Sequence, residues 1–373
     1  MRAFFTKLNK PLYGYILLTL IAAASILFVN HNHFLYEKPI AKVTETKLVA
    51  TEDLVDRFEN RDHLYTQEMV AVIKNGDLKG QNITITNEYS DSNAYDSKYR
   101  VGDEVFVSIK ENTNEKTLTG TIQSVKRDQY VLIVAWIFIL TLLFVGRKQG
   151  LFAIISLAVN AILLSLALDM YAKTGVSLLW ICGISIIIFT IISLMLVNGI
   201  NEKTFVTILA TLLGTFVSLL ITYLVMEITN DNGLRYEEMQ FLTRPYRMVF
   251  LAGLFIGSLG AVMDVAITLV SSIYGLAEKN PDISVKALQA SGFEIGKDIM
   301  GTMTNILFFA YVSGSIPMLI LYLKNGSPLG FTLSMNLSLE LARALAGGIG
   351  IVITIPIALY TTIFFINRKR RIA

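Results

Sequence analysis

The sequence is poor in residues that carry covalent or metal chemistry. Among 373 residues there is one cysteine, Cys182, so no disulfide and no cysteine-based metal site can form within one chain. The only histidines, His31, His33 and His63, all lie near the N-terminus. No glycine-rich nucleotide loop, Ser–His–Asp set or zinc motif occurs. The sequence therefore predicts no enzyme activity, no cofactor and no metal site.

Charge is scarce as well. Charged residues make up 16% of the chain, whereas soluble domains carry about a quarter. Hydrophobic residues make up 53%, and the mean hydropathy is +0.56. These values indicate a polytopic membrane protein whose main partner is the lipid bilayer. The net charge of +3 and the lack of a basic aromatic patch speak against nucleic acid as a partner.

Residues 1–29 are predicted to be an N-terminal membrane anchor. Arg2, Lys7 and Lys10 precede an apolar run that continues to Val29. A cleaved signal peptide is the alternative, because Ala22–Ala24 offers a small-residue cleavage site. The continuation of the apolar run favours the uncleaved anchor.

Residues 30–128 change character and predict a β-rich domain. They are more charged, and short alternating pieces are separated by turn residues. A small barrel of the OB or SH3 type fits this length, with 45–63 as a lead-in helix or strand. A binding or gating accessory is favoured over a spacer. The predicted strands are Gln67–Ile73, Gln81–Thr86, Glu104–Ile109 and Leu118–Val125.

Residues 129–373 predict a seven-span membrane domain, so that the whole chain has about eight spans in an all-α bundle. Long apolar runs set these spans, because a membrane helix needs about 20 apolar residues. They are 130–146, 150–170, 176–199, 204–227, 248–276, 302–323 and 337–366.

The distribution of Lys and Arg predicts the orientation. With an internal N-terminus, the short inner segments carry thirteen of these residues and the short outer loops five. This asymmetry predicts a plasma-membrane protein with both termini cytoplasmic and residues 30–128 extracytoplasmic.

The stretch 248–276 carries a stripe of small and polar residues. Their spacing of three or four places them on one helix face, which is typical of close packing between membrane helices. Asp264 interrupts the stripe, and an ionisable residue within a span indicates a functional site. The predicted packing glycines here are Gly253, Gly257, Gly260 and Gly275, and Thr268 and Ser271 complete the stripe.

The next span places Asp298, Thr302 and Asn305 on one face. We predict that these residues contact a substrate or ion together with Asp264. Gly314 and Pro317 follow, and because proline removes a backbone donor, we expect a hinge there.

The last span carries Glu340 and Arg343, which can pair as i,i+3 neighbours. Gly347 and Gly350 are predicted packing positions and Pro356 a second hinge. An Asp264–Arg343–Glu340 cluster is geometrically possible if the two helices are neighbours. It would be either a buried ion-pair network or an ion-responsive site beside a substrate path.

Three runs resemble the YibE/F family of bacterial membrane proteins, and the resemblance covers about residues 130–373 and, more loosely, the exported domain. It implies a YibE-like member with an exported N-terminal domain, and a partner that is a shorter sister protein or a second copy. It supplies no established activity. The runs are GSLGAVMDVAITLVSSIYGL, NPDISVKALQASGFEIGKDIMGTMTNILFFAYVSGSIP and NLSLELARALAGGIGIVITIPIA.

Two functions fit these features. The first is a secondary transporter or exporter, since helix interruptions and intramembrane charges mark transport sites. The second is a membrane sensor or assembly scaffold whose polar centre is structural. A proteolytic dyad of Asp264 and Asp298 has poor geometry, because the two differ in depth and paired carboxylates must share a proton.

Overall fold

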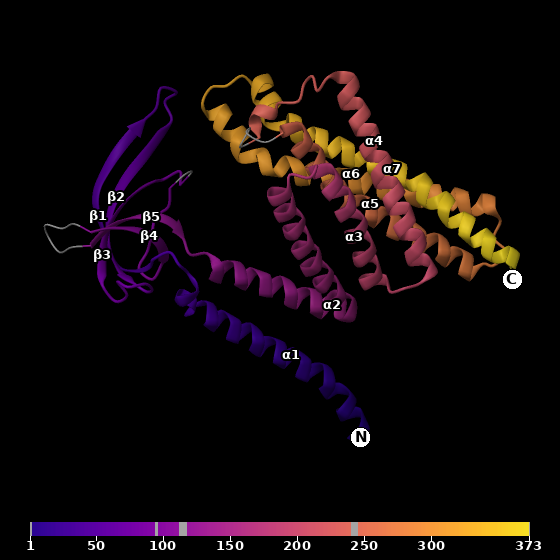
Figure 1. The fold of residues 1–373 in the computed structure, drawn as a ribbon, viewed down its shortest axis with the longest axis horizontal. Helices are drawn as coiled ribbons and strands as arrows, with labels where there is room; N and C mark the ends of the chain where they lie inside the picture. Colours follow the sequence, from indigo (N-terminus) through magenta and orange to yellow (C-terminus); the bar gives the residue numbers. More distant parts are fainter. Residues whose placement is uncertain (1, 94–95, 112–117, 240–244, 373) are drawn as a thin grey trace. The chain divides into compact units, whose positions relative to one another are not determined.

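The computed structural model describes residues 2–93, 96–111, 118–239 and 245–372. The chain divides into two compact units, Met1–Phe144 and Val145–Ala373. The first unit holds one helix, five strands and the start of a second helix, and the second unit is helical (Figure 1).

In the first unit, α1 (Arg2–Val29) leads through a short 3₁₀ turn, η1 (Asn32–Leu35), into a domain of five strands, which we call the β-domain. The four strands expected from the sequence are present, and the lead-in segment is a strand. The strands are β1 (Ile40–Val55), β2 (Arg61–Ile73), β3 (Asn82–Ser90), β4 (Glu104–Glu111) and β5 (Leu118–Val125).

The strands follow the order β1-β2-β3-β5-β4, and β4 pairs back with β1, which closes the barrel. All pairings are antiparallel except β3 with β5. Alternate positions of β2 face inward, as a strand with one buried face requires. The core contains Ala41, Val43, Met69, Ala71, Ile73, Ile83, Ile85, Val105 and Val107.

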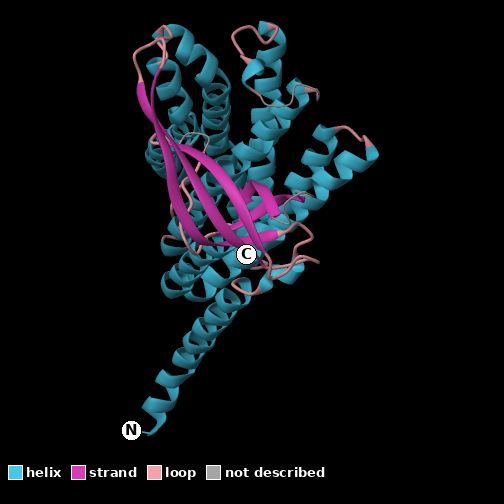
Figure 2. Cartoon of the chain, turned by 90° about the vertical axis from the view of Figure 1, so that its left-hand side faces the viewer, coloured by secondary structure: helices cyan, strands magenta, loops and turns pink. Residues whose placement is uncertain are grey.

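The β1–β2 hairpin reaches beyond this core. The register extends to the pair Val55↔Arg61, yet every β1 residue from Glu45 onward is exposed. Figure 2 shows the two strands as a long curved ribbon. Only the first quarter of β1, residues 40–43, therefore contributes to the barrel interior.

The helical unit contains five complete helices and most of α2, and six described helices are long and apolar enough to cross a membrane. The predicted count of eight is not established. α2 covers two predicted spans, with non-helical φ and ψ at Arg147 between them, and the described apolar part of α1, Leu17–Val29, is short. The six are α2 (Asp128–Thr174), α3 (Leu178–Asn198), α4 (Glu202–Thr229), α5 (Tyr246–Lys279), α6 (Val285–Lys324) and α7 (Leu329–Ile372).

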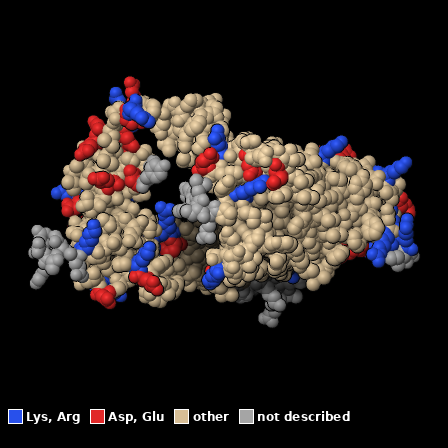
Figure 3. Space-filling view, turned by 45° about the horizontal axis from the view of Figure 1, so that its top comes forward, with Lys and Arg blue, Asp and Glu red and all other residues tan. Residues whose placement is uncertain are grey.

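One face of the helical unit shows a charge distribution that suits a membrane. Figure 3 shows one face, on which Lys, Arg, Asp and Glu gather toward helix ends and leave a broad uncharged band on the helical unit. A band without charge suits the hydrocarbon core of a bilayer.

Helix α7 packs against α4, α5 and α6 and so holds the bundle together. Small residues bring α4 and α7 close. A Cβ on Gly214 would lie 3.2 Å from Cβ of Thr354 and would clash with its hydroxyl, and one on Gly350 would lie 3.1 Å from Oγ of Ser218. Ser218 also donates a 3.0 Å hydrogen bond to the backbone carbonyl of Ala346. Such contacts replace hydrophobic driving force between membrane helices.

The predicted packing glycines divide into two groups. Gly347 and Gly350 pack as predicted: a Cβ on Gly347 would lie 2.8 Å from Leu307. The α5 positions Gly253, Gly260 and Gly275 have no atom of the described chain within 4 Å of an added Cβ. The described chain therefore gives these three no packing partner. Gly257 on the same α5 face does have one, since a Cβ there would lie 2.5 Å from the hydroxyl of Tyr311 on α6.

The predicted hinges lie inside continuous helices. α6 runs through Gly314 and Pro317, and α7 runs through Pro356. The expected break near Gly314 is therefore not observed. In membrane helices neighbouring helices, Ser or Thr side chains, or water can satisfy the carbonyl that proline frees, so proline is tolerated there.

The α4–α7 contact generates a paired test. We expect Gly214→Ala to lower the free energy of unfolding by about 1–3 kcal/mol, because overpacking at a tight contact is unfavourable. Gly253→Ala is the matched control and should not destabilise, because its position is open. Thermal unfolding in detergent measures both. Equal destabilisation by the control would mean that the Gly253 face is packed against another chain.

Candidate functional site

A cavity of about 460 Å³ lies at one end of the helical unit, between η2 (Tyr236–Glu238), the end of α6 and the start of α7. We call it the Glu238 pocket. It is lined by Glu237, Glu238, Met239, Gly314, Ser315, Met318, Tyr322, Met335, Asn336, Leu339, Glu340 and Arg343.

Two lining residues form the ion pair that their spacing predicts. Nη1 of Arg343 donates to Oε1 of Glu340, one turn earlier on α7. The guanidinium carbon of Arg343 lies 5.3 Å from the ring centre of Phe250 on α5, a cation–π distance. Both side chains of the pair are 23% exposed. The pair is therefore partly shielded from water and held on two sides.

Glu238 faces this pair and was not predicted. Burial raises the pKa of Glu238 to about 7, with a further rise from Glu340 that Arg343 partly offsets. No ion pair within the described residues involves Glu238. The acidic doublet Glu237-Glu238 between two apolar spans is visible in the sequence. Only the fold shows that it returns to the Arg343 turn of α7.

Asn336 closes one wall of the pocket. The residue is 2% exposed, and its Nδ2 donates a 2.9 Å hydrogen bond to the carbonyl of Thr332. Its Oδ1 has no hydrogen-bond donor among the residues that the structure describes. This oxygen is not among the fully buried atoms without a partner in the described chain, so it is open to a donor from water or from a molecule in the cavity.

Asp264 is not brought to this pocket. It is exposed on α5, together with Gly253, Gly257, Gly260, Thr268 and Ser271 of the predicted stripe. Its backbone carbonyl accepts a 2.8 Å hydrogen bond from the Thr268 hydroxyl. In the described chain Asp264 contacts neither Arg343 nor Glu340, so the predicted three-residue cluster is reduced to its α7 pair.

The predicted α6 residues lie elsewhere too. Thr302 and Asn305 bond to backbone carbonyls one turn earlier, those of Asp298 and Gly301, and all are exposed. Asn305 lines an open groove of about 630 Å³ between α6 and α7. The groove is otherwise almost wholly apolar, with Met300, Ala344, Leu345, Ile349, Val352 and Ile353 among its walls.

A third cavity, of about 440 Å³, lies at the opposite end of α4, α5 and α7, and its charges are paired. Lys203 lies 2.9 Å from Glu278, and Lys369 lies 3.3 Å from Glu202. These matched charges contrast with the Glu238 pocket, where carboxylates outnumber cations.

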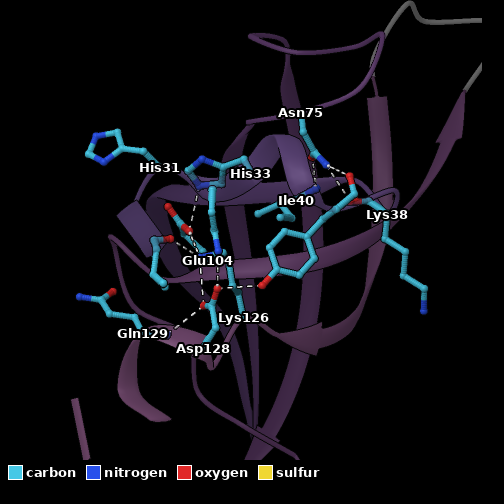
Figure 4. A network of polar contacts seen from close by, with 12 residues as sticks. His31, His33, Lys38, Ile40, Asn75, Glu104, Lys126, Asp128 and Gln129 are labelled. Carbon is cyan, nitrogen blue, oxygen red and sulfur yellow. Dashed lines mark hydrogen bonds and ion pairs between the residues drawn. The ribbon is translucent and has the colours of Figure 1, made fainter. Parts of the chain in front are cut away.

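The first unit holds a separate buried network, which we call the junction network: Asn32, His33, Tyr36, Glu104, Lys126 and Asp128 (Figure 4). Lys126 is its centre, with a side chain 3% exposed. Its Nζ lies 3.0 Å from Asp128 and 3.5 Å from Glu104, and it donates to the carbonyl of Val29 at 2.9 Å.

The other members bind the same two carboxylates. Asn32 and Tyr36 donate to Oδ2 of Asp128 at 3.0 and 2.8 Å, and Nε2 of His33 lies 3.0 Å from Glu104. The network therefore connects the end of α1 and the start of α2 to Glu104 of β4. Farther along, the indole of Trp136 donates a 2.7 Å hydrogen bond to Ser25, which joins the two helices directly.

An apolar helical bundle preceded by a small β-domain defines the class: a multi-pass membrane protein. The chain belongs to the YibE/F family, since the YibE/F-like protein family model matches residues 134–368 and the YibE/F family N-terminal domain model matches residues 34–125. Comparison with curated proteins and with solved structures gives no match.

The ion pair in the Glu238 pocket generates a double-mutant test. Glu340→Gln leaves Arg343 without its carboxylate partner, and Arg343→Met leaves Glu340 without its cation. We expect a coupling energy of about 1–2 kcal/mol from the cycle, since the pair is only partly exposed. Chemical denaturation in detergent measures it. The exposed Lys203–Glu278 pair is the control, with an expected coupling below about 0.5 kcal/mol. Equal couplings would contradict a shielded site.

Proposed function

We propose that the protein is a secondary transporter of the bacterial plasma membrane and that the Glu238 pocket is its solute site. The observation that carries the proposal is a cavity whose wall combines an ion pair, a carboxylate without an ion-pair partner among the described residues, and an amide whose oxygen has no donor there. A half-buried carboxylate without a counter-charge is unfavourable unless a proton or a cation binds it, and here the cavity gives such a cation access.

The position of the pocket supports the same proposal. It lies among the ends of α6 and α7 and the α4–α5 connection, which the Lys and Arg distribution predicts to be outside. The strand order and the single parallel pairing fit an OB-type barrel, and we propose that the β-domain has this fold.

Gly314 and Pro317 offer a way to couple the pocket to movement. Gly314 lines the pocket, and Pro317 one turn later removes a backbone donor. Because α6 is mostly exposed along this stretch, few contacts oppose its bending. We propose that bending of α6 here opens the pocket, with Glu238 and Glu340 exchanging protons or cations as the solute passes.

The test is flux into proteoliposomes that enclose a pH-sensitive dye, with and without a pH gradient, during screening of solutes by charge class. We expect Glu340→Gln to lower solute-coupled proton flux at least tenfold, because Arg343 is left unpaired in the pocket. Asp264→Asn should keep flux within twofold, because Asp264 lies outside the pocket.

The opposite pattern is equally informative. Loss of flux in folded Asp264→Asn, with flux intact in Glu340→Gln, would move the path to the α5 stripe. Absence of coupled flux for every solute class, in protein that retains its wild-type thermal unfolding, would contradict transport.

The junction network favours a second candidate, a membrane sensor. Lys126 links two carboxylates and a helix end, so a change in the β-domain reaches α1 and α2 through bonded contacts. In this function the β-domain binds a ligand and the helices relay the event.

Lys126→Met tests the relay, because it leaves Glu104 and Asp128 without their cation. We expect faster amide hydrogen exchange in residues 29–36 and 126–136 of the full-length protein, and no change in the exposed control Lys110→Met. In cells that lack the native protein, the sensor function expects Lys126→Met to reach the membrane but fail to complement. Complementation at the wild-type level would contradict the relay.

A further inference from the structure

The charges of the Glu238 pocket point to the class of its ligand. Among its lining residues three are acidic and one is basic: Glu237, Glu238, Glu340 and Arg343. The basic residue is already engaged, since Arg343 donates to Glu340 and its guanidinium lies over Phe250. An anion would have to displace Glu340 from Arg343 and then lie among carboxylates. The pocket therefore favours a cation.

The remaining lining favours an organic cation over a metal ion. Met239, Met318, Met335, Leu339 and Tyr322 provide an apolar surface, and methionine adapts to ligands of varied shape. A volume of about 460 Å³ is in the range of small-molecule pockets. No group of three or more His, Cys, Asp or Glu side chains suited to a metal ion occurs in the described residues.

The side chain of Asn336 indicates which kind of organic cation the pocket favours. Oδ1 of Asn336, on the pocket wall, receives no hydrogen bond from the described residues and is not among their fully buried unsatisfied atoms, so it is open to a donor in the cavity. An ammonium group that keeps its N–H bonds can donate to this oxygen and to a carboxylate at the same time. A quaternary ammonium group has no such hydrogen.

We propose that the Glu238 pocket binds a protonated amine with an apolar body. The carboxylate of Glu238 receives the ammonium group, Oδ1 of Asn336 accepts one of its hydrogens, and the methionine side chains cover the body. This deepens the proposed transport function by naming its substrate class, although binding itself does not require transport.

Proton competition gives the proposal a pH signature. The pKa of Glu238 is about 7, so a proton occupies its carboxylate at pH 6 and leaves it at pH 8. The ionisable groups that face it are Glu237 from η2, Tyr322 from α6, and Glu340 and Arg343 from α7. Glu340 and Arg343 are already bound to each other as an ion pair, so we assign the expected pH response to Glu238. Affinity for an amine should rise about tenfold from pH 6 to pH 8.

The experiment is calorimetric titration of the purified full-length protein in detergent with phenethylamine, whose amine stays protonated in this range. Benzoate, benzyl alcohol and benzyltrimethylammonium are the anionic, neutral and quaternary comparisons. We expect phenethylamine to bind most tightly and with the stated pH rise. Glu238→Gln should weaken binding at least tenfold at pH 8 and remove the pH dependence. Asp282→Asn, an exposed carboxylate at the other end of α6, should change neither.

The outcomes separate the two proposals. Benzoate binding as tightly as phenethylamine, a flat pH profile in the wild type, or unchanged binding in folded Glu238→Gln would overturn the amine site. Tighter binding of the quaternary compound would overturn the role of Asn336. Amine binding without coupled flux would leave this inference standing and refute transport. Coupled flux of another solute without amine binding would support transport and refute the amine site.

Discussion

The close approach of α4 and α7 determines the rest of the helical unit. Gly214 and Gly350 leave no room for a side chain between these helices, and Ser218 bonds to the α7 backbone across the gap. Where the surroundings are as apolar as the helices, such contacts and hydrogen bonds supply the association energy. Because α7 also packs against α5 and α6, this contact sets the position of α7 along the bundle. It thereby places Glu340 and Arg343 beside the segment that connects α4 and α5.

That placement has an electrostatic consequence. Arg343 is held by Glu340 and by the face of Phe250, so it is only partly available to a third group. Glu238, from the segment that connects α4 and α5, lines the same pocket. The cation of that pocket, Arg343, is already paired with Glu340. Removing a carboxylate from water without a full counter-charge favours its protonated form, which accounts for its raised pKa. The pocket thus contains one group that responds to protons or cations near neutral pH.

The sequence predicted local features well and contacts between elements poorly. Four strands, the helical runs and the Glu340–Arg343 pair all follow from spacing within one segment. The α5 and α7 stripes have the same spacing of three and four, yet Gly350 is buried against α4 and Gly260 is open. The spacing identifies a helix face of small residues, but it does not show which element, if any, packs against that face. Glu238 was missed for the same reason, since its importance comes from a contact about a hundred residues along the chain.

The two buried clusters of the protein show how structure and function can be distinguished. In the junction network the buried cation Lys126 has two carboxylates and a backbone carbonyl, and both carboxylates accept further hydrogen bonds or ion pairs. These paired charges hold the elements together. The network is not fully satisfied, because Oδ1 of Asn32 is buried without a hydrogen-bond partner among the described residues. In the Glu238 pocket a carboxylate and the Asn336 oxygen border an open cavity without partners in the described chain. Because both clusters contain polar atoms without partners, such atoms alone do not distinguish a ligand site. The distinguishing feature of the Glu238 pocket is its cavity, whose wall carries a carboxylate without an ion-pair partner among the described residues.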